Sequence, residues 1–134
     1  MTSSQLTYPL RYAWVWLAGG YLVLATIVLG SLIPGMPGPD FIAADKLVHL
    51  GIYLVLMLWF AGIYLPRRHL WVLLSLALLS IGLELVQEYS GLRNGDWRDV
   101  VANVVGLSGG LLLARLGLAG WCLNAEKWLS GMRG

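Results

Sequence analysis

The side chains best suited to acid–base chemistry in this 134-residue chain fall at helical spacing in three segments. In the first segment Asp45, His49 and Tyr53 stand four residues apart, and Lys46 lies beside them. Positions at i, i+4 and i+8 drift only about 80° around a helix, so these side chains form one stripe. Histidine changes its charge near neutral pH, and a histidine beside a carboxylate is a candidate general acid or base.

The second and third segments repeat this pattern. Glu84 and Glu88 are one helical turn apart with Gln87 on the same face, and Asp99 and Asn103 are also one turn apart. Three helices would each bury polar groups at the same membrane depth only if they faced one another. We therefore predict one shared polar pocket that opens at one surface of the membrane.

The segment between the second and third groups is expected to cover this pocket. It contains the turn signals Ser90-Gly91 and Asn94-Gly95. Arg93, Asp96 and Trp97 lie in the same segment. A guanidinium can bind a phosphate or carboxylate with two hydrogen bonds, so Arg93 is a candidate for holding an anionic group, together with Lys46.

Composition identifies the elements that must position these groups. The chain is 58% hydrophobic and 12% charged, with a mean hydropathy of +0.73, whereas soluble domains are about 45–50% apolar and about 25% charged. The sequence predicts a single all-α membrane domain over residues 1–134, with a short interfacial C-terminal helix or a frayed extension of the fourth span. Four transmembrane helices are expected at about residues 13–33, 45–65, 70–89 and 98–120.

The same composition excludes several classes of protein. A net charge of +2 without a basic run does not favour nucleic acid as a partner. Cys122 is the one cysteine, so the chain has no internal disulfide and no thiolate metal cluster. We expect no cofactor and no bound metal. His49 with Glu84, Glu88 or Asp99 is the alternative, a site for zinc or another divalent cation.

The distribution of basic residues predicts the orientation. Four spans place both termini on one side, where six Lys and Arg residues are expected against three on the other. The positive-inside rule then predicts a bacterial inner-membrane protein with both termini in the cytoplasm and the pocket in the outer leaflet. Five tryptophans are expected to form a belt on the cytoplasmic side: Trp14, Trp16, Trp71, Trp121 and Trp128.

With these motifs the chain resembles the VanZ-like family of integral membrane proteins. The resemblance covers residues 45–106 and lies in three patterns, D-K-x-x-H-x-x-x-Y from Asp45, E-x-x-Q from Glu84, and R-x-x-D-x-x-D-x-x-x-N-x-x-G from Arg93 to Gly106. It implies a small multi-helix membrane protein, and the founding member of the family is associated with low-level resistance to the glycopeptide teicoplanin. It implies no reaction and no catalytic roles.

Three hypotheses for the function stay open at this point. The first is an enzyme that acts on a lipid or lipid-linked headgroup, with His49, Glu84 and Asp99 as catalytic residues. The second is a binding, lipid-handling or proton-coupled transport protein, which as a transporter would need to form a homo-oligomer. The third is a structural network in which Asp45, Asp96 and Asp99 cap helices.

For the first two hypotheses the expected partners are membrane lipids and a lipid-linked cell-wall precursor or an amphiphilic antibiotic. The predicted binding residues are Asp45, Lys46, Tyr53, Gln87, Glu88, Arg93, Asp96 and Asn103.

Overall fold

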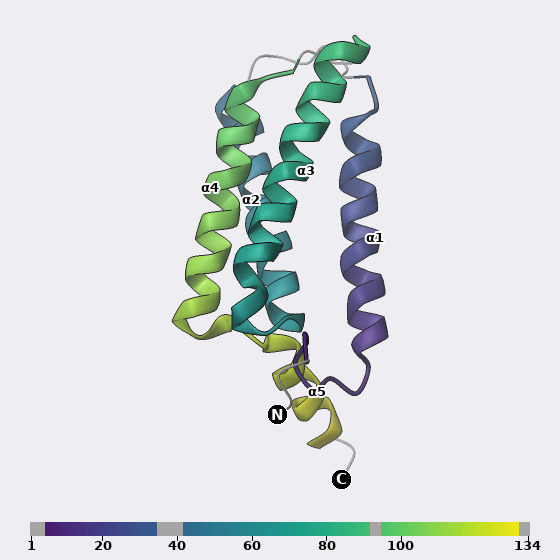
Figure 1. Cartoon of the computed structure of the whole chain (residues 1–134), viewed down its shortest axis with the longest axis vertical. Helices are drawn as coiled ribbons and strands as arrows, with labels where there is room; N and C mark the ends of the chain where they lie inside the picture. Colours follow the sequence, from purple (N-terminus) through teal and green to yellow (C-terminus); the bar gives the residue numbers. More distant parts are fainter. Residues whose placement is uncertain (1–4, 35–41, 92–94, 132–134) are drawn as a thin grey trace.

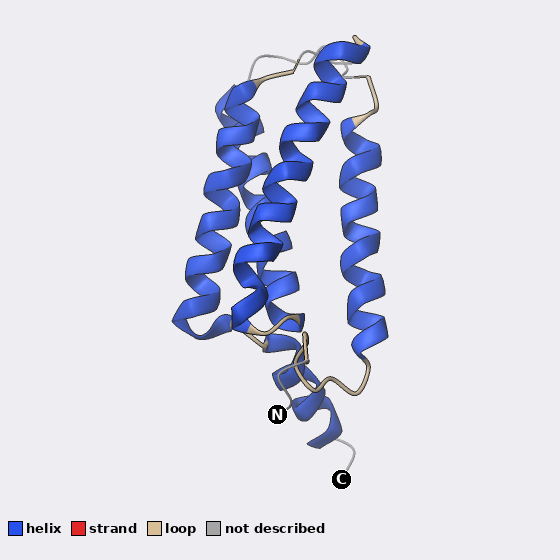
Figure 2. Ribbon diagram, in the orientation of Figure 1, coloured by secondary structure: helices blue, strands red, loops and turns tan. Residues whose placement is uncertain are grey.

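Four long helices run side by side in alternating directions, and the two ends of the chain lie at the same end of the bundle (Figure 1). The computed structural model describes residues 5–34, 42–91 and 95–131, which form helices and loops but no strand (Figure 2). The long helices are α1 (Ala13–Ser31), α2 (Ile42–Ile63), α3 (His69–Ser90) and α4 (Trp97–Leu113). Each of them, α4 together with the turn that follows it, is long and apolar enough to cross a membrane. The all-α prediction and its four apolar spans are confirmed.

Helix boundaries follow local signals in the sequence. Pro66 opens a 3₁₀ turn, Pro66–Arg68, which links α2 to α3. Gly91 ends α3 in the left-handed conformation with φ 67°, which glycine adopts without steric cost. The helix α2 begins at Ile42, three residues before its predicted start, so Asp45 lies in its first turn.

The C-terminal segment is a helix of its own. Ala114–Leu118 forms a single π-helical turn in which Gly117 has φ 127°. Gly120 follows with φ 70°, and α5 (Trp121–Gly131) then begins in a new direction. These two positive φ angles separate α5 from α4, so the tail is not a continuation of α4.

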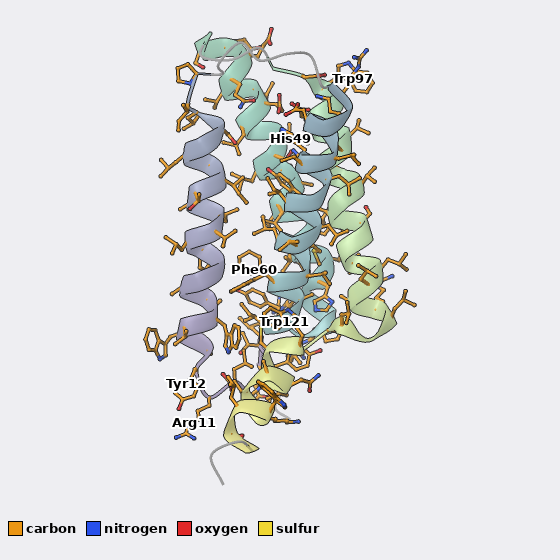
Figure 3. The ribbon with its side chains drawn as sticks, turned by 180° about the vertical axis from the view of Figure 1, so that it is seen from behind. Arg11, Tyr12, His49, Phe60, Trp97 and Trp121 are labelled. Atoms are coloured by element: carbon orange, nitrogen blue, oxygen red, sulfur yellow. The ribbon has the colours of Figure 1, made fainter. Side chains whose placement is uncertain are left out.

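Three tryptophans hold the terminal end of the bundle together. Trp16 of α1, Trp59 of α2 and Trp121 of α5 pack edge to face, with ring centroids 5.2–6.1 Å apart. The Trp59 ring N–H donates to the carbonyl of Trp16 at 3.0 Å, and the Trp121 ring N–H to that of Leu58 at 2.9 Å. Trp16 and Trp121 are therefore half-buried in this cluster, and Figure 3 labels Trp121 where α5 meets the bundle, while Trp14, Trp71 and Trp128 are exposed, as a belt requires.

Glu126 of α5 adds a second attachment at this end. Its carboxylate accepts hydrogen bonds from the backbone N–H groups of Arg11 (2.7 Å) and Tyr12 (2.9 Å), and from the ring N–H of Trp16 (2.9 Å). Burial raises the pKa of this carboxyl, but the three hydrogen bonds outweigh it and lower the pKa. The C-terminal helix thus holds the segment that leads into α1.

The helices α2 and α4 approach each other most closely. A Cβ atom at Gly106 would overlap the backbone carbonyl of Leu50, and one at Gly110 would lie 2.7 Å from the carbonyl oxygen of Leu54. Glycines one turn apart are a common way for membrane helices to pack backbone against backbone. This close pair brings the polar stripe of α2 against that of α4.

Candidate functional site

Lys46, near the start of α2, lies among three carboxylates. Its Nζ is 2.8 Å from Asp96 and 3.5 Å from Asp45, and it also contacts Asp99. Figure 3 shows oxygen-bearing side chains gathered at this end of the bundle, around His49. An ammonium group has three donors, and the ammonium of Lys46 is paired with these three carboxylates of the same chain.

The start of α4 explains two of these acids. Asp96 is the N-cap residue, and its side chain accepts from the backbone N–H of Arg98 at 2.9 Å. Asp99 follows in the first turn, where the helix dipole favours a negative charge. Hydrogen bonds from Lys46 and from the Arg98 N–H keep the pKa of Asp96 below its ordinary value. Capping therefore accounts for Asp96, as the third hypothesis expects.

His49 lies between two carboxylates and an amide. Its Nε2 is 3.9 Å from Asp45 and 3.7 Å from Asp99, and its Nδ1 is 3.2 Å from Oδ1 of Asn103. An amide oxygen accepts, so in this arrangement Nδ1 is the donor. Nε2 then faces the carboxylates, where an imidazole can pass a proton to or from a third group.

The polar network continues from Asn103 toward the middle of the bundle. The Asn103 amide donates to the hydroxyl of Ser80 on α3 at 2.8 Å, and Ser80 is hydrogen-bonded to Tyr53. All three side chains are at most 3% exposed. Tyr53 is eight residues beyond Asp45, roughly 12 Å along the helix, so the network descends almost halfway through a hydrocarbon layer of about 30 Å.

The two glutamates of α3 hold the connection to α4. Glu84 accepts from the backbone N–H of Asp96 at 2.8 Å, and Glu88 accepts from that of Gly95 at 3.1 Å. A carboxylate late in a helix is disfavoured by the dipole of its own helix. Here these N–H groups, which directly precede α4, compensate for it.

Gln87 points toward α1. It is 5% exposed, and its amide donates to the carbonyl of Ser31 at 2.6 Å. Ser31 is the last residue of α1. The bond attaches the far end of α1 to α3, and it brings into the site a helix that the sequence had not suggested.

A cavity of about 350 Å³ lies beside this network, between all four long helices. Ligand pockets commonly measure about 300–1,000 Å³. Among the described residues, Asp45 and Glu84 are the acidic residues that line it, and Lys and Arg are absent. The polar lining comes from Thr26 and Ser31 of α1, Asp45, His49 and Tyr53 of α2, Ser80, Glu84 and Gln87 of α3, and Asn103 of α4.

The predicted residues thus separate into two neighbouring groups. Six of them line the cavity: Asp45, His49, Tyr53, Glu84, Gln87 and Asn103. Lys46, Asp96 and Asp99 form the ion-pair cluster between α2 and α4. Glu88 is exposed and bonds to the Gly95 backbone, and Arg93 lies outside the described residues.

Three polar residues of the cavity lining had not been predicted: Ser80, Thr26 and Ser31. Ser80 precedes Glu84 by four residues and Gln87 by seven, so the helical period of α3 could have identified it. Thr26 and Ser31 lie in an uncharged helix. No charge or motif marks α1 as part of a site.

Asp45, His49 and Asp99 also have the geometry of a metal site. One ligand atom from each lies within 4.8 Å of the others. The Lys46 ammonium contacts both of these carboxylates and so provides the positive charge that a metal ion would bring. The expectation of no bound metal stays a prediction.

Comparison of the chain with protein-family models, with curated proteins and with solved structures finds no match.

Proposed function

We propose that this chain is a multi-pass membrane protein whose polar cavity binds the headgroup of a lipid or a lipid-linked molecule. One observation carries the proposal. A cavity of about 350 Å³, lined by polar side chains from all four spans, reaches from the level of Asp45 down to Tyr53. Its lining combines apolar surface, including Ile27 and Ile52, with these polar groups. A cavity of this size with a few convergent polar groups is suited to a headgroup that enters from the surrounding leaflet.

The energetics of membrane helices favour a binding site over a purely structural network. Interhelical hydrogen bonds in membranes contribute only about 0.6 kcal/mol each on average. Ionisable residues within spans cost about 2.5–3.5 kcal/mol at the bilayer centre, and they are functional-site candidates for that reason. Capping explains Asp96, but it does not explain the buried Asn103 and Ser80 and the half-buried His49 beside a cavity.

The distribution of charge supports a location and an orientation. The terminal end of the bundle carries Arg11, Arg67, Arg68, Arg115 and Lys127, whereas Lys46 and Arg98 lie at the other end. We infer a bacterial inner-membrane protein with cytoplasmic termini, in which the cavity opens in the outer leaflet. In this orientation α5, with exposed Trp128 and Leu129, is at the cytoplasmic end of the bundle.

The resemblance to the VanZ-like family supports an envelope role. The motif residues that carry it lie close together in space, because Lys46 contacts Asp96 and Asp99, and His49 contacts Asn103. As candidate ligands we propose a lipid-linked cell-wall precursor or an amphiphilic antibiotic that inserts into the outer leaflet. The association with teicoplanin resistance comes from the family alone.

A catalytic variant of this proposal assigns proton transfer to His49, with Asp99 and Glu84 as its acidic partners. His49 Nε2 is 3.7 Å from Asp99, and Glu84 lines the same cavity as His49. General acid–base catalysis by such groups contributes typically about 10²–10⁴-fold. These catalytic roles stay predictions.

The test is native mass spectrometry of the protein released from its own membrane in mild detergent. His69 offers a control, because it is a second hydrogen-bonded histidine at the other end of the bundle, where it is buried and its Nε2 lies 2.9 Å from the carbonyl of Tyr64. We expect a lipid adduct on the wild type and on His69→Gln, but not on His49→Gln. Bare protein in all three samples, with His49→Gln less stable to heat, would instead indicate a structural network.

A further inference from the structure

The charge of the cavity wall favours a cation. Its two acidic residues among those described are Asp45 and Glu84. Asp45 already neighbours Lys46 and His49, and Glu84 accepts from the backbone of Asp96. Carboxylates bind N–H-bearing cations through charge-assisted hydrogen bonds, and among the described residues the cavity wall has no Lys or Arg.

The end of the bundle opposite the two termini also carries a net negative charge. Among the described residues at that end, five acidic side chains face two basic ones. The acids are Asp45, Glu84, Glu88, Asp96 and Asp99, and the bases are Lys46 and Arg98. An anionic headgroup would enter against this net negative field, whereas a cationic one would be attracted by it.

A second cavity continues from the first along the seam between α1 and α3. It measures about 410 Å³, and its lining is mostly apolar, with Leu24 of α1, Phe60 of α2 and Leu79 of α3 among its residues. Leu24 is one turn from Ile27 of the polar cavity, and Leu79 directly precedes Ser80. The two cavities therefore follow one another along the same pair of helices.

The helix α1 closes this seam only loosely. Gly20 is its one buried residue, and in Figure 1 the helix stands to one side of the other three. Toward α3 it is attached by the Gln87–Ser31 bond at its end. Its other contacts are with α2 and α5: the tryptophans and Glu126 at its start, and Tyr21 in its middle, whose ring packs edge to face on Phe60 at 5.7 Å. On the side that faces α3, side chains of α1 border both cavities.

We propose that the cavity selects a lipid whose headgroup carries a primary ammonium, and that this lipid enters sideways between α1 and α3. The ammonium lies between Asp45 and Glu84, and one hydrocarbon tail follows the seam toward Phe60. This inference rests on the proposed headgroup-binding function and adds its ligand chemistry and route of entry. Ammonium–carboxylate hydrogen bonds are among the strong ones, and only an N–H-bearing cation can donate them.

The experiment uses the full chain in nanodiscs of phosphatidylcholine that contain equal small amounts of phosphatidylethanolamine and phosphatidylglycerol. Lipids retained on the protein after release are identified by native mass spectrometry. We expect phosphatidylethanolamine to be enriched over phosphatidylglycerol by about tenfold or more relative to the disc. Glu84→Gln keeps an acceptor for the Asp96 N–H but removes the charge, and it should abolish most of this enrichment. Glu126→Gln, the same change at the other end, should not.

The outcomes separate the two proposals. Equal or preferential retention of phosphatidylglycerol would overturn the ammonium selectivity and leave a headgroup site. Retention of no lipid at all would overturn both proposals. Soluble glycerophosphoethanolamine is the final arm, because it has the headgroup without the tails. If it displaces the lipid at equal concentration, the tail contributes nothing and lateral entry along the seam is wrong.

Discussion

The α2–α4 interface and the α1–α3 seam run along the same bundle but pack in opposite ways. At Gly106 and Gly110 the backbones of α2 and α4 leave no room for a methyl group. Along the seam, α1 and α3 both line two cavities, which measure about 410 and 350 Å³. The close pair fixes the positions of the charged and hydrogen-bonding groups, and α1 is, in our proposal, the wall past which a lipid enters. A site that a lipid enters from the membrane requires both fixed binding groups and a wall that the lipid can pass.

The largest expected effect breaks the close pair. Gly106→Ala places a methyl group against the Leu50 backbone, which cannot change rotamer to avoid it. We expect a loss of about 1–3 kcal/mol in the free energy of unfolding, the usual cost of overpacking. Thermal unfolding in detergent measures it. Gly51→Ala is the control, because its methyl group would meet nothing within 4 Å, and an equal loss there would show that the close contact is not the cause.

A smaller effect is expected from a substitution that loosens the N-terminal end of α1. Glu126→Ala removes three hydrogen bonds from the segment that leads into this helix. Since a hydrogen bond contributes about 0.5–1.5 kcal/mol net and these N–H groups can turn to water, we expect a total loss of about 1–2 kcal/mol. Amide hydrogen exchange should speed up in α5 and at the start of α1. Lys127→Ala, one residue on, should leave exchange unchanged, and faster exchange in both variants would point to the tail as a whole.

A substitution that detaches the C-terminal end of α1 from α3 should have a still smaller effect on stability. Gln87→Leu removes the bond to Ser31 while filling a similar volume. The expected cost is only about 0.6 kcal/mol, the average for an interhelical hydrogen bond in a membrane. Exchange of bound lipid should nevertheless become faster, with hydrogen exchange rising near the end of α1. If lipid exchange is unchanged while that end becomes mobile, α1 is not the wall through which lipid enters.

The smallest expected effect is a loss of local stability at acidic pH, at the start of α4 and in α5. The folded pKa values of Asp96 and Glu126 lie below their ordinary values of 3.8 and 4.5. The unfolded chain therefore binds more protons, so this stabilisation is complete above about pH 5 and is lost as the pH falls through the folded pKa values. Protection factors at the start of α4 and in α5 should decrease on acidification from about pH 6 to about pH 3. Asp96→Asn and Glu126→Gln should each remove this decrease at their own end only.

Much of the fold could be predicted because it depends on local apolar length. Predominantly apolar runs bounded by Arg11, by Pro66 and by Gly91 give the spans within a few residues. The break before α5 could not be decided, because it depends on the positive φ angles of Gly117 and Gly120. A glycine permits such an angle but does not require it.

The site was predictable where charge and period coincide. Asp45, His49 and Tyr53 lie on one stripe as expected, and Asn103 meets His49 from the facing helix. The partners chosen by Glu84, Glu88 and Gln87 were not predictable, because they are backbone groups that no residue type marks. The contribution of α1 was not predictable for the same reason, because Gln87 bonds to a backbone carbonyl of that helix.

The central claim, a lipid held between α1 and α3, is tested most directly by photocrosslinking in the native membrane. A diazirine amino acid replaces Ile27, which lines the polar cavity, or Leu22, which is 69% exposed on the same helix. After illumination, mass spectrometry identifies the lipid attached to each. We predict a narrow set of amine-bearing lipids at Ile27 and the bulk lipid mixture at Leu22. The same mixture at both positions, or crosslinks from Ile27 to α3 alone, would contradict the account.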